Sequence, residues 1–123
     1  MPSKRILLIG IDPNLVDFSR SRERSAESVK TAGNTARERL TARGYEVREC
    51  LVDLGETAES VVEKTLSETP FDCIMIGAGI RALPQHTLLF ERIINAVHRH
   101  APSAKLSFNS KPEDTVEAIL RWT

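Results

Sequence analysis

The chain has 123 residues, and 17 Lys and Arg balance 17 Asp and Glu, which gives a formal net charge of zero. This length predicts one domain over residues 1–123, and the balanced charge disfavours a dedicated nucleic-acid binder or membrane-surface binder. No stretch approaches the ~20 apolar residues that a membrane span needs, so we also expect no membrane partner.

The chain begins with a strand and a long helix. Residues 4–11 form a continuous apolar run, which is typical of a strand covered on both faces. Residues 25–43 show helical periodicity and stop before Gly44, a common residue at helix ends. The inner stripe of this helix consists mostly of small residues, so we expect it to sit close to the sheet. That stripe comprises Val29, Ala32, Gly33, Ala36 and Leu40.

A second strand and helix follow. Residues 45–52 alternate only in part between apolar and polar side chains, which favours an edge strand. The next helix has two candidate starts. Thr57 is a good N-cap residue, whereas Ser60 has the spacing of a capping box and would give a shorter helix. Either helix ends before Pro70.

The second half of the chain repeats this alternation. Residues 71–76 predict a buried strand and residues 105–108 a short fourth strand. Between them a helix covers residues 86–100, and a last helix begins near residues 112–114, where acidic side chains suit the helix dipole. Phe90, Ile93, Ile94 and Val97 should face the sheet. Leu88, Leu89 and Ala96 then need cover from the first loop, from the last helix with Trp122, or from a second subunit.

The order of elements is therefore βαβαβαβα. Crossovers between parallel strands are almost always right-handed. The sequence thus predicts an α/β fold, a three-layer αβα sandwich with a four-stranded parallel sheet in the order 2-1-3-4.

In such sheets ligands bind beyond the carboxyl ends of the strands, where the strand order reverses. Here that point lies between the first and third strands. The loop over residues 12–24 is long for a strand-to-helix connection, which favours a flap over a ligand. Asp12 would be fixed at the strand end and Asn14 would lie beside it. The alternative is a solvated turn that Asp12 starts.

The turn after the third strand carries the next candidates. Gly77 and Gly79 let the backbone approach a ligand closely, and Arg81 can grip a carboxylate or phosphate. The spacing G-x-G-x-x-A is that of a dinucleotide fingerprint, but it follows the wrong strand, and Pro84 delays the helix. NAD and FAD are therefore disfavoured, and an anion cradle or a purely structural turn remains.

Two further polar residues lie at the same edge. Asn109 follows the fourth strand as a ligand contact or a helix cap. His86 is the one histidine at this edge, either as a weak candidate for proton transfer or as an ordinary residue of the first helical turn. We expect no metal site, because Cys50 and Cys73 are too few for zinc alone. The cofactor is left open.

Taken whole, the chain resembles a group of short bacterial Rossmann-like proteins of unknown function. The resemblance is carried by residues 10–13, 77–81, 95–102, 108–109 and 112–114. The order of elements is also similar to flavodoxin-like domains, shortened by one strand. The resemblance implies no activity. If it includes Asn95 and His98, the helix over residues 86–100 has a role toward a ligand or partner.

These observations predict a binding protein or small enzyme for a small anionic ligand at the carboxyl edge of the sheet. The alternative is a dimeric interaction domain without catalysis, because a four-stranded sheet leaves two open edges. The two cysteines also cannot build a disulfide framework, and Asp12 interrupts the first apolar run without a signal-peptide cleavage site. We therefore expect a cytoplasmic location.

Overall fold

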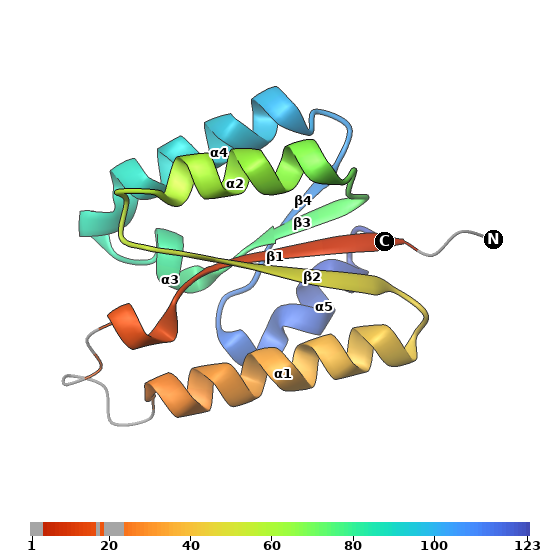
Figure 1. Ribbon diagram of the computed structural model, residues 1–123. Coiled ribbons are helices and arrows are strands. Elements are labelled where there is room, and N and C mark those ends of the chain that lie inside the picture. Colours follow the sequence, from red (N-terminus) through yellow and green to blue (C-terminus); the bar gives the residue numbers. More distant parts are fainter. Residues whose placement is uncertain (1–3, 17, 19–23) are drawn as a thin grey trace.

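The computed structural model describes residues 4–16, 18 and 24–123, and in this part of the chain four strands form one parallel sheet (Figure 1). The strand order β2-β1-β3-β4 confirms the predicted order and the predicted fold class. Both outer strands, β2 and β4, are edges, as expected. The strands are β1 (Arg5–Ile11), β2 (Glu46–Val52), β3 (Cys73–Ile76) and β4 (Lys105–Phe108).

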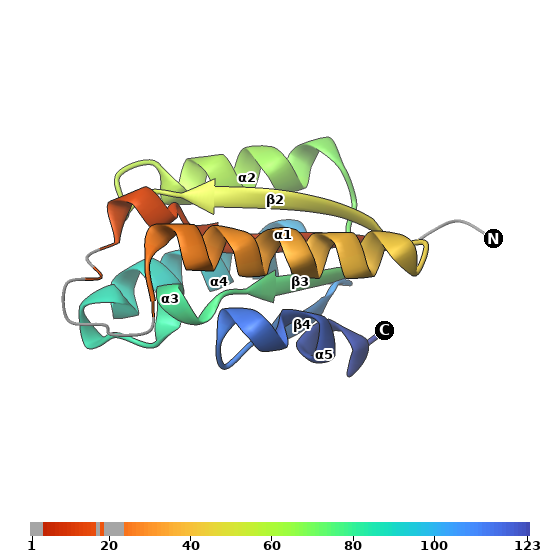
Figure 2. The same ribbon diagram turned by 90° about the horizontal axis from the view of Figure 1, so that it is seen from below.

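Helices cover both faces of this sheet (Figures 1 and 2). The first and last helices lie on one face and the second and fourth on the other. A short helix, α3, and three 3-10 turns connect the remaining elements. The helices are α1 (Ala26–Ala42), α2 (Ala58–Glu68), α3 (Ala78–Arg81), α4 (Thr87–His100) and α5 (Thr115–Leu120), and the 3-10 turns are η1 (Pro13–Leu15), η2 (Pro84–His86) and η3 (Pro112–Asp114).

The apolar run of β1 is continuous because its side chains enter two cores. Ile6 and Leu8 pack toward α1 and α5, whereas Leu7, Ile9 and Ile11 pack toward α2 and α4. Successive strand residues point to opposite faces, so a strand buried on both sides needs apolar residues at every position.

The start of α2 depends on a residue outside the helix. The helix begins after Thr57, but the Thr57 side chain makes no capping hydrogen bond. Instead, Asp53 at the end of β2 accepts hydrogen bonds from the Thr57 backbone N–H and hydroxyl, at 3.0 Å and 2.7 Å. It also accepts one from the Gly55 N–H at 3.0 Å. The longer of the two predicted helices is therefore the one that forms.

The expected inner face of α4 requires correction. Ile93 and Val97 are buried as expected, but Leu89 and Ala96 are buried as well, while Phe90 and Ile94 are half-buried at the margin of the same core. The cover for Leu89 comes from α2 and α3 on the same face of the sheet, with Ile80 of α3 in the shared cluster. The expected cover by the last helix is wrong, because α5 lies on the opposite face and Trp122 is 55% exposed.

The long loop after β1 is described only in part. It opens with η1, whose first residues follow Asp12 directly. Residues 17 and 19–23 lie outside the described residues, and the predicted flap over residues 12–24 falls largely on them. Among the helices of the described residues, none has the length and apolar character needed to cross a membrane.

Candidate functional site

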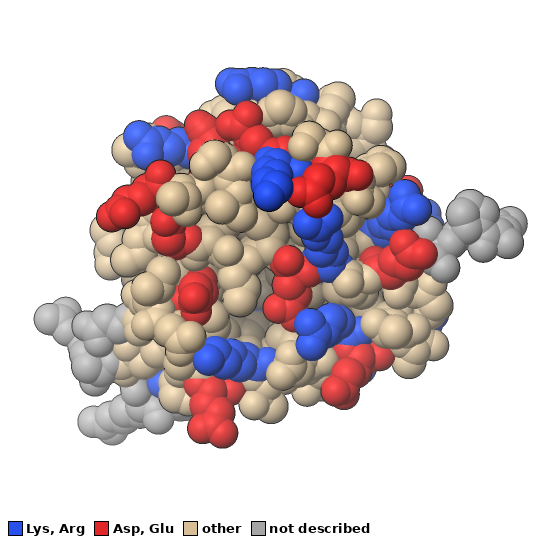
Figure 3. All heavy atoms as spheres, in the orientation of Figure 1, with Lys and Arg blue, Asp and Glu red and all other residues tan. Residues whose placement is uncertain are grey.

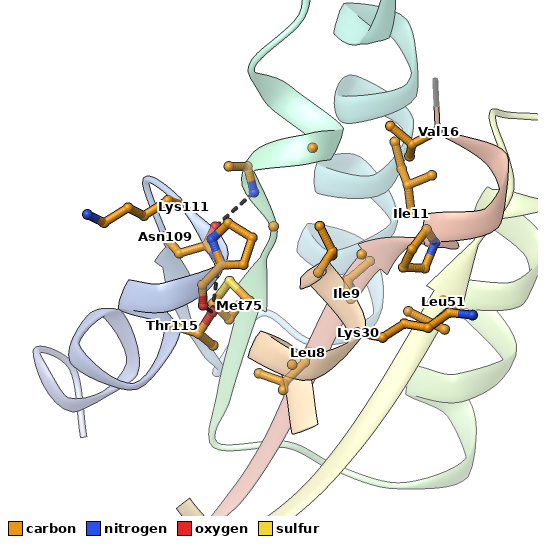
Figure 4. A pocket seen from close by; sticks show the side chains of 18 of the residues that line it. Leu8, Ile9, Ile11, Val16, Lys30, Leu51, Met75, Asn109, Lys111 and Thr115 are labelled. Atoms are coloured by element: carbon orange, nitrogen blue, oxygen red, sulfur yellow. Dashed lines mark hydrogen bonds between the residues drawn. The ribbon is translucent and has the colours of Figure 1, made fainter. Parts of the chain in front are cut away.

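A cavity of about 500 Å³ opens at the carboxyl ends of β1 and β3, on the face of the sheet that α1 covers (Figure 4). Its lining comes from the sheet, from the amino-terminal half of α1, and from the segment between β4 and α5. This position is the switch point of the strand order, because the connection that leaves β1 runs to β2 on one side and the connection that leaves β3 runs to β4 on the other.

Two glycines create this hollow. Gly10 on β1 alternates with Ile6 and Leu8, so it faces α1, and a Cβ there would lie 4.0 Å from the nearest heavy atom, in Leu51. A Cβ on Gly33 of α1 would meet no heavy atom within 4 Å. At these two positions neither the sheet nor the helix contributes a side chain that would fill the space. Ala36 of α1 is buried in the core, as expected for a small residue of the inner stripe, whereas Gly33 leaves a space instead of a close contact.

The walls of the cavity are mainly apolar. Leu8 of β1, Leu51 of β2 and Met75 of β3 form the side that the sheet contributes (Figure 4). Glu49 also lines the cavity, three residues before the end of β2, and its carboxylate lies 3.1 Å from the Arg37 guanidinium. Arg37 lies outside the lining and offsets only part of this charge, so Glu49 is the one carboxylate among the described residues of the lining.

Cationic side chains lie at the rim. Lys30 of α1 runs along the β2 side of the cavity and ends beside Leu51, while Lys111 extends away from the opposite side (Figure 4). Arg24 donates two hydrogen bonds of 2.7 Å to Glu113, which joins the start of α1 to η3. These hydrogen bonds are the largest cause of the lowered pKa of Glu113.

A chain of hydrogen bonds links two predicted residues to Lys30. The Asp12 carboxylate accepts a hydrogen bond from the Asn14 N–H at 3.0 Å and thereby caps η1. The Asn14 side-chain oxygen in turn accepts a hydrogen bond from the Lys30 ammonium at 3.2 Å. Asp12 and Asn14 lie outside the cavity lining, and their contacts position a residue that does line it.

Three predicted residues lie in the cavity lining itself, namely Gly77, Gly79 and Asn109. The backbone at Gly77 packs closely against β1, and a Cβ there would be 3.3 Å from the Ile9 carbonyl oxygen. This close contact favours glycine at position 77. Asn109 is buried and uses both ends of its amide. Its oxygen accepts a hydrogen bond from the Ala78 N–H at 2.8 Å, and its nitrogen donates to the Thr115 hydroxyl at 3.0 Å. Asn109 thus joins α3 to α5.

Arg81 lies at the same edge of the sheet but outside the cavity lining. Its Nε donates to the Ile76 carbonyl oxygen at 3.4 Å, and its guanidinium lies 5.2 Å from the centre of the Phe108 ring, a cation–π contact. Burial lowers the pKa of Arg81, and the nearby Asp114 carboxylate opposes this effect in part. Both contacts hold the side chain in place against the protein.

His86 also lies outside the lining. Its Nδ1 is 2.9 Å from the Gly79 carbonyl oxygen. A carbonyl oxygen only accepts hydrogen bonds, so Nδ1 is the donor in this contact. On α4, Asn95 donates to the Glu91 carbonyl oxygen at 2.8 Å within its own helix, and His98 is exposed. Neither residue of α4 lines the cavity.

Two lining residues, Lys30 and Glu49, are not predicted as site residues from the sequence. Both lie inside regular elements, away from the loops in which a site is normally sought. Over the face that carries β2 and α1, Lys and Arg mix with Asp and Glu (Figure 3). Ion pairs such as Arg37–Glu49 and Arg48–Glu68 account for part of this mixture. Lys30 forms no such pair within the described residues.

Comparisons with known proteins add no identity: neither a family model nor a curated protein matches the chain. The described residues also hold no cluster of three or more His, Cys, Asp or Glu side chains suited to a metal ion. The arguments about function therefore depend on the geometry of the cavity and its rim.

Proposed function

We propose that this protein binds a small anionic molecule in the cavity at the carboxyl edge of its sheet. The observation that carries the proposal is the cavity itself, about 500 Å³ in volume, at the switch point of a parallel sheet. Sites for small molecules usually enclose roughly 300–1,000 Å³ and are mainly apolar with a few polar groups. The Lys30 ammonium at the rim, whose hydrogen-bond partner is the neutral Asn14 amide oxygen, favours an anion.

Binding without catalysis is the form of this proposal that the contacts support. Arg81 and His86, the residues with the most reactive chemistry at this edge, lie outside the lining and bond to backbone carbonyl oxygens. In the lining, the Ser110 hydroxyl donates a hydrogen bond to the Asp114 carboxylate, which also accepts the Ser110 and Lys111 N–H groups and so caps the start of η3. The polar groups of the cavity are therefore suited to holding a ligand in one orientation.

A thermal-shift panel tests the binding proposal. The probes are phosphate, acetate, benzoate, octanoate and AMP at millimolar concentration. Gly33→Leu places a side chain in the cavity, and Glu38→Leu puts the same side chain on an exposed position of α1 as the matched control. We expect at least one anion to raise the Tm of the wild type and of the control but not of Gly33→Leu. No shift with any anion, or equal shifts in all three proteins, would refute the proposal.

A dimeric interaction domain is the second candidate. The outer edge of β2 has no strand partner among the described residues, and Leu51 and Leu54 near its carboxyl end are 50% and 52% exposed. A second copy of the chain would cover both. Sedimentation equilibrium tests the dimer. Leu54→Glu should dissociate it, whereas Leu83→Glu, which changes an exposed leucine elsewhere, should leave it intact. A wild-type mass of one chain would exclude the dimer.

We also propose that the protein is cytoplasmic and that it belongs to the group of short bacterial Rossmann-like proteins that its sequence resembles. Cys50 and Cys73 are free and buried, which fits a reducing compartment. Localisation of a tagged chain by fractionation tests the first proposal, with recovery outside the cytoplasm as the contrary result.

A further inference from the structure

We propose that the ligand is an amphipathic monoanion, with an aliphatic body inside the cavity and a carboxylate at the rim beside the Lys30 ammonium. This inference rests on the proposed function and names the chemical class of ligand for the same site. It also makes two residues specificity-determining. Gly33 leaves space for the apolar body, and Lys30 holds the charged end.

The interior of the cavity favours an apolar body. Leu8, Leu51 and Met75 offer no hydrogen bonds to a polar ligand. Taking a polar group out of water without a new hydrogen bond is costly, so a small polar anion such as phosphate loses more than it gains there. An aliphatic chain gains about 0.8 kcal/mol for each buried methylene. The apolar walls thus select against fully hydrophilic anions.

The inner end of the cavity also excludes a second negative charge. Glu49 lies three residues from the carboxyl end of β2, which places it roughly 10 Å inside the edge at about 3.3 Å per residue. Its carboxylate is already paired with Arg37. An anionic group at that depth would face the Glu49 carboxylate, and the negative end of a ligand therefore belongs at the rim.

Among the rim cations, Lys30 is the one suited to receive it. Arg24 is engaged in two hydrogen bonds with Glu113. Lys111 extends away from the cavity (Figure 4). Lys30, by contrast, has a neutral amide oxygen as its hydrogen-bond partner. Within the described residues Lys30 forms no direct ion pair with a carboxylate.

The hydrogen bonds before α1 support this assignment. Asn14 holds the Lys30 ammonium at 3.2 Å, and Asp12 in turn fixes the backbone of Asn14. A lysine side chain has substantial rotamer freedom, which ligand binding has to restrict. Holding the ammonium at the rim in advance reduces that cost. Asp12 and Asn14 are accordingly positioning residues for Lys30.

The charge test compares octanoate with octanamide by isothermal titration calorimetry. Lys30→Gln should weaken octanoate binding by roughly 10- to 100-fold, the range expected when a charge-assisted hydrogen bond is lost, and should leave octanamide binding within about twofold. Lys30→Arg should restore most of the octanoate affinity. The matched control is Lys64→Gln, which removes an exposed lysine of α2 and should leave octanoate binding unchanged. Octanoate binding that Lys30→Gln leaves unchanged would overturn the role of Lys30.

The chain-length test uses butanoate, hexanoate and octanoate. Affinity should rise roughly fourfold for each added methylene, which corresponds to about 0.8 kcal/mol, and Gly33→Leu should abolish this gain, whereas Glu38→Leu should not. If phosphate or AMP binds in a manner that Gly33→Leu blocks while octanoate does not bind, the proposed function stands and the amphipathic ligand is refuted. If no anion binds, both proposals fail together. Circular dichroism of each variant confirms that it is folded.

Discussion

Replacing Gly33 with Ala should stabilise the protein. Gly33 lies in the interior of α1, where glycine is about 0.8–1.0 kcal/mol less favourable than alanine because of its backbone entropy. The new Cβ would meet no heavy atom within 4 Å, so no clash offsets this gain. We therefore expect the free energy of unfolding to rise by about 1 kcal/mol, which for a chain of 123 residues corresponds to roughly 3–5 °C in Tm. Urea titration followed by circular dichroism measures both quantities.

Gly44 provides a control of opposite sign. It follows the end of α1 with a φ of +89°, a conformation that side chains disfavour. Gly44→Ala should therefore cost about 1–2 kcal/mol, although it makes the same chemical change in the same region. If Gly33→Ala instead destabilises the protein, α1 lies closer to the sheet in solution and the cavity is not open as described. A gain in stability would show that the space beside Gly33 accommodates a methyl group.

The fold follows from patterns that a sequence shows directly. The apolar runs of β1 and β3 report burial on both faces, and the intervening helices force parallel strands with right-handed crossovers. What escaped prediction is α3, because Gly77-Ala78-Gly79 reads as a turn and four residues are too few for a helical period. The inner face of α4 was predicted correctly at Ile93 and Val97, but the prediction missed the buried Leu89 and Ala96. Leu89 is buried partly by Ile80 of α3.

The candidate site shows a similar division. Gly77, Gly79 and Asn109 reach the cavity because they follow the carboxyl ends of strands, and strand order alone determines where those ends meet. Lys30 and Glu49 are brought there by the packing of α1 on β1 and β2. Periodicity assigns such residues to solvated faces. The sequence does not show that Gly33, one helical turn after Lys30, leaves a space between α1 and the sheet that both side chains border.

Three further predictions concern buried or capping groups. The Ser107 hydroxyl is fully buried without a hydrogen-bond partner among the described residues, so Ser107→Ala should stabilise the protein by about 1 kcal/mol in urea titrations, and a loss of that size would reveal a partner in solution. Burial raises the pKa of Cys50, and burial together with the Asp72 charge raises that of Cys73 to about 11. Native protein at pH 8 should therefore not react with Ellman's reagent until denatured, and rapid labelling of the native state would contradict this. The last prediction concerns Asp53, whose pKa is lowered by hydrogen bonds from the Thr57 hydroxyl and N–H and from the Gly55 N–H. A carboxylate with a lowered folded-state pKa stabilises the fold above its unfolded pKa of ~4, and this contribution disappears as the pH falls through the folded value. Asp53→Asn should consequently be less stable than the wild type at pH 7, and the difference should shrink steadily below about pH 4. A difference that stays constant down to pH 2 would show that the charge of Asp53 does not hold the start of α2.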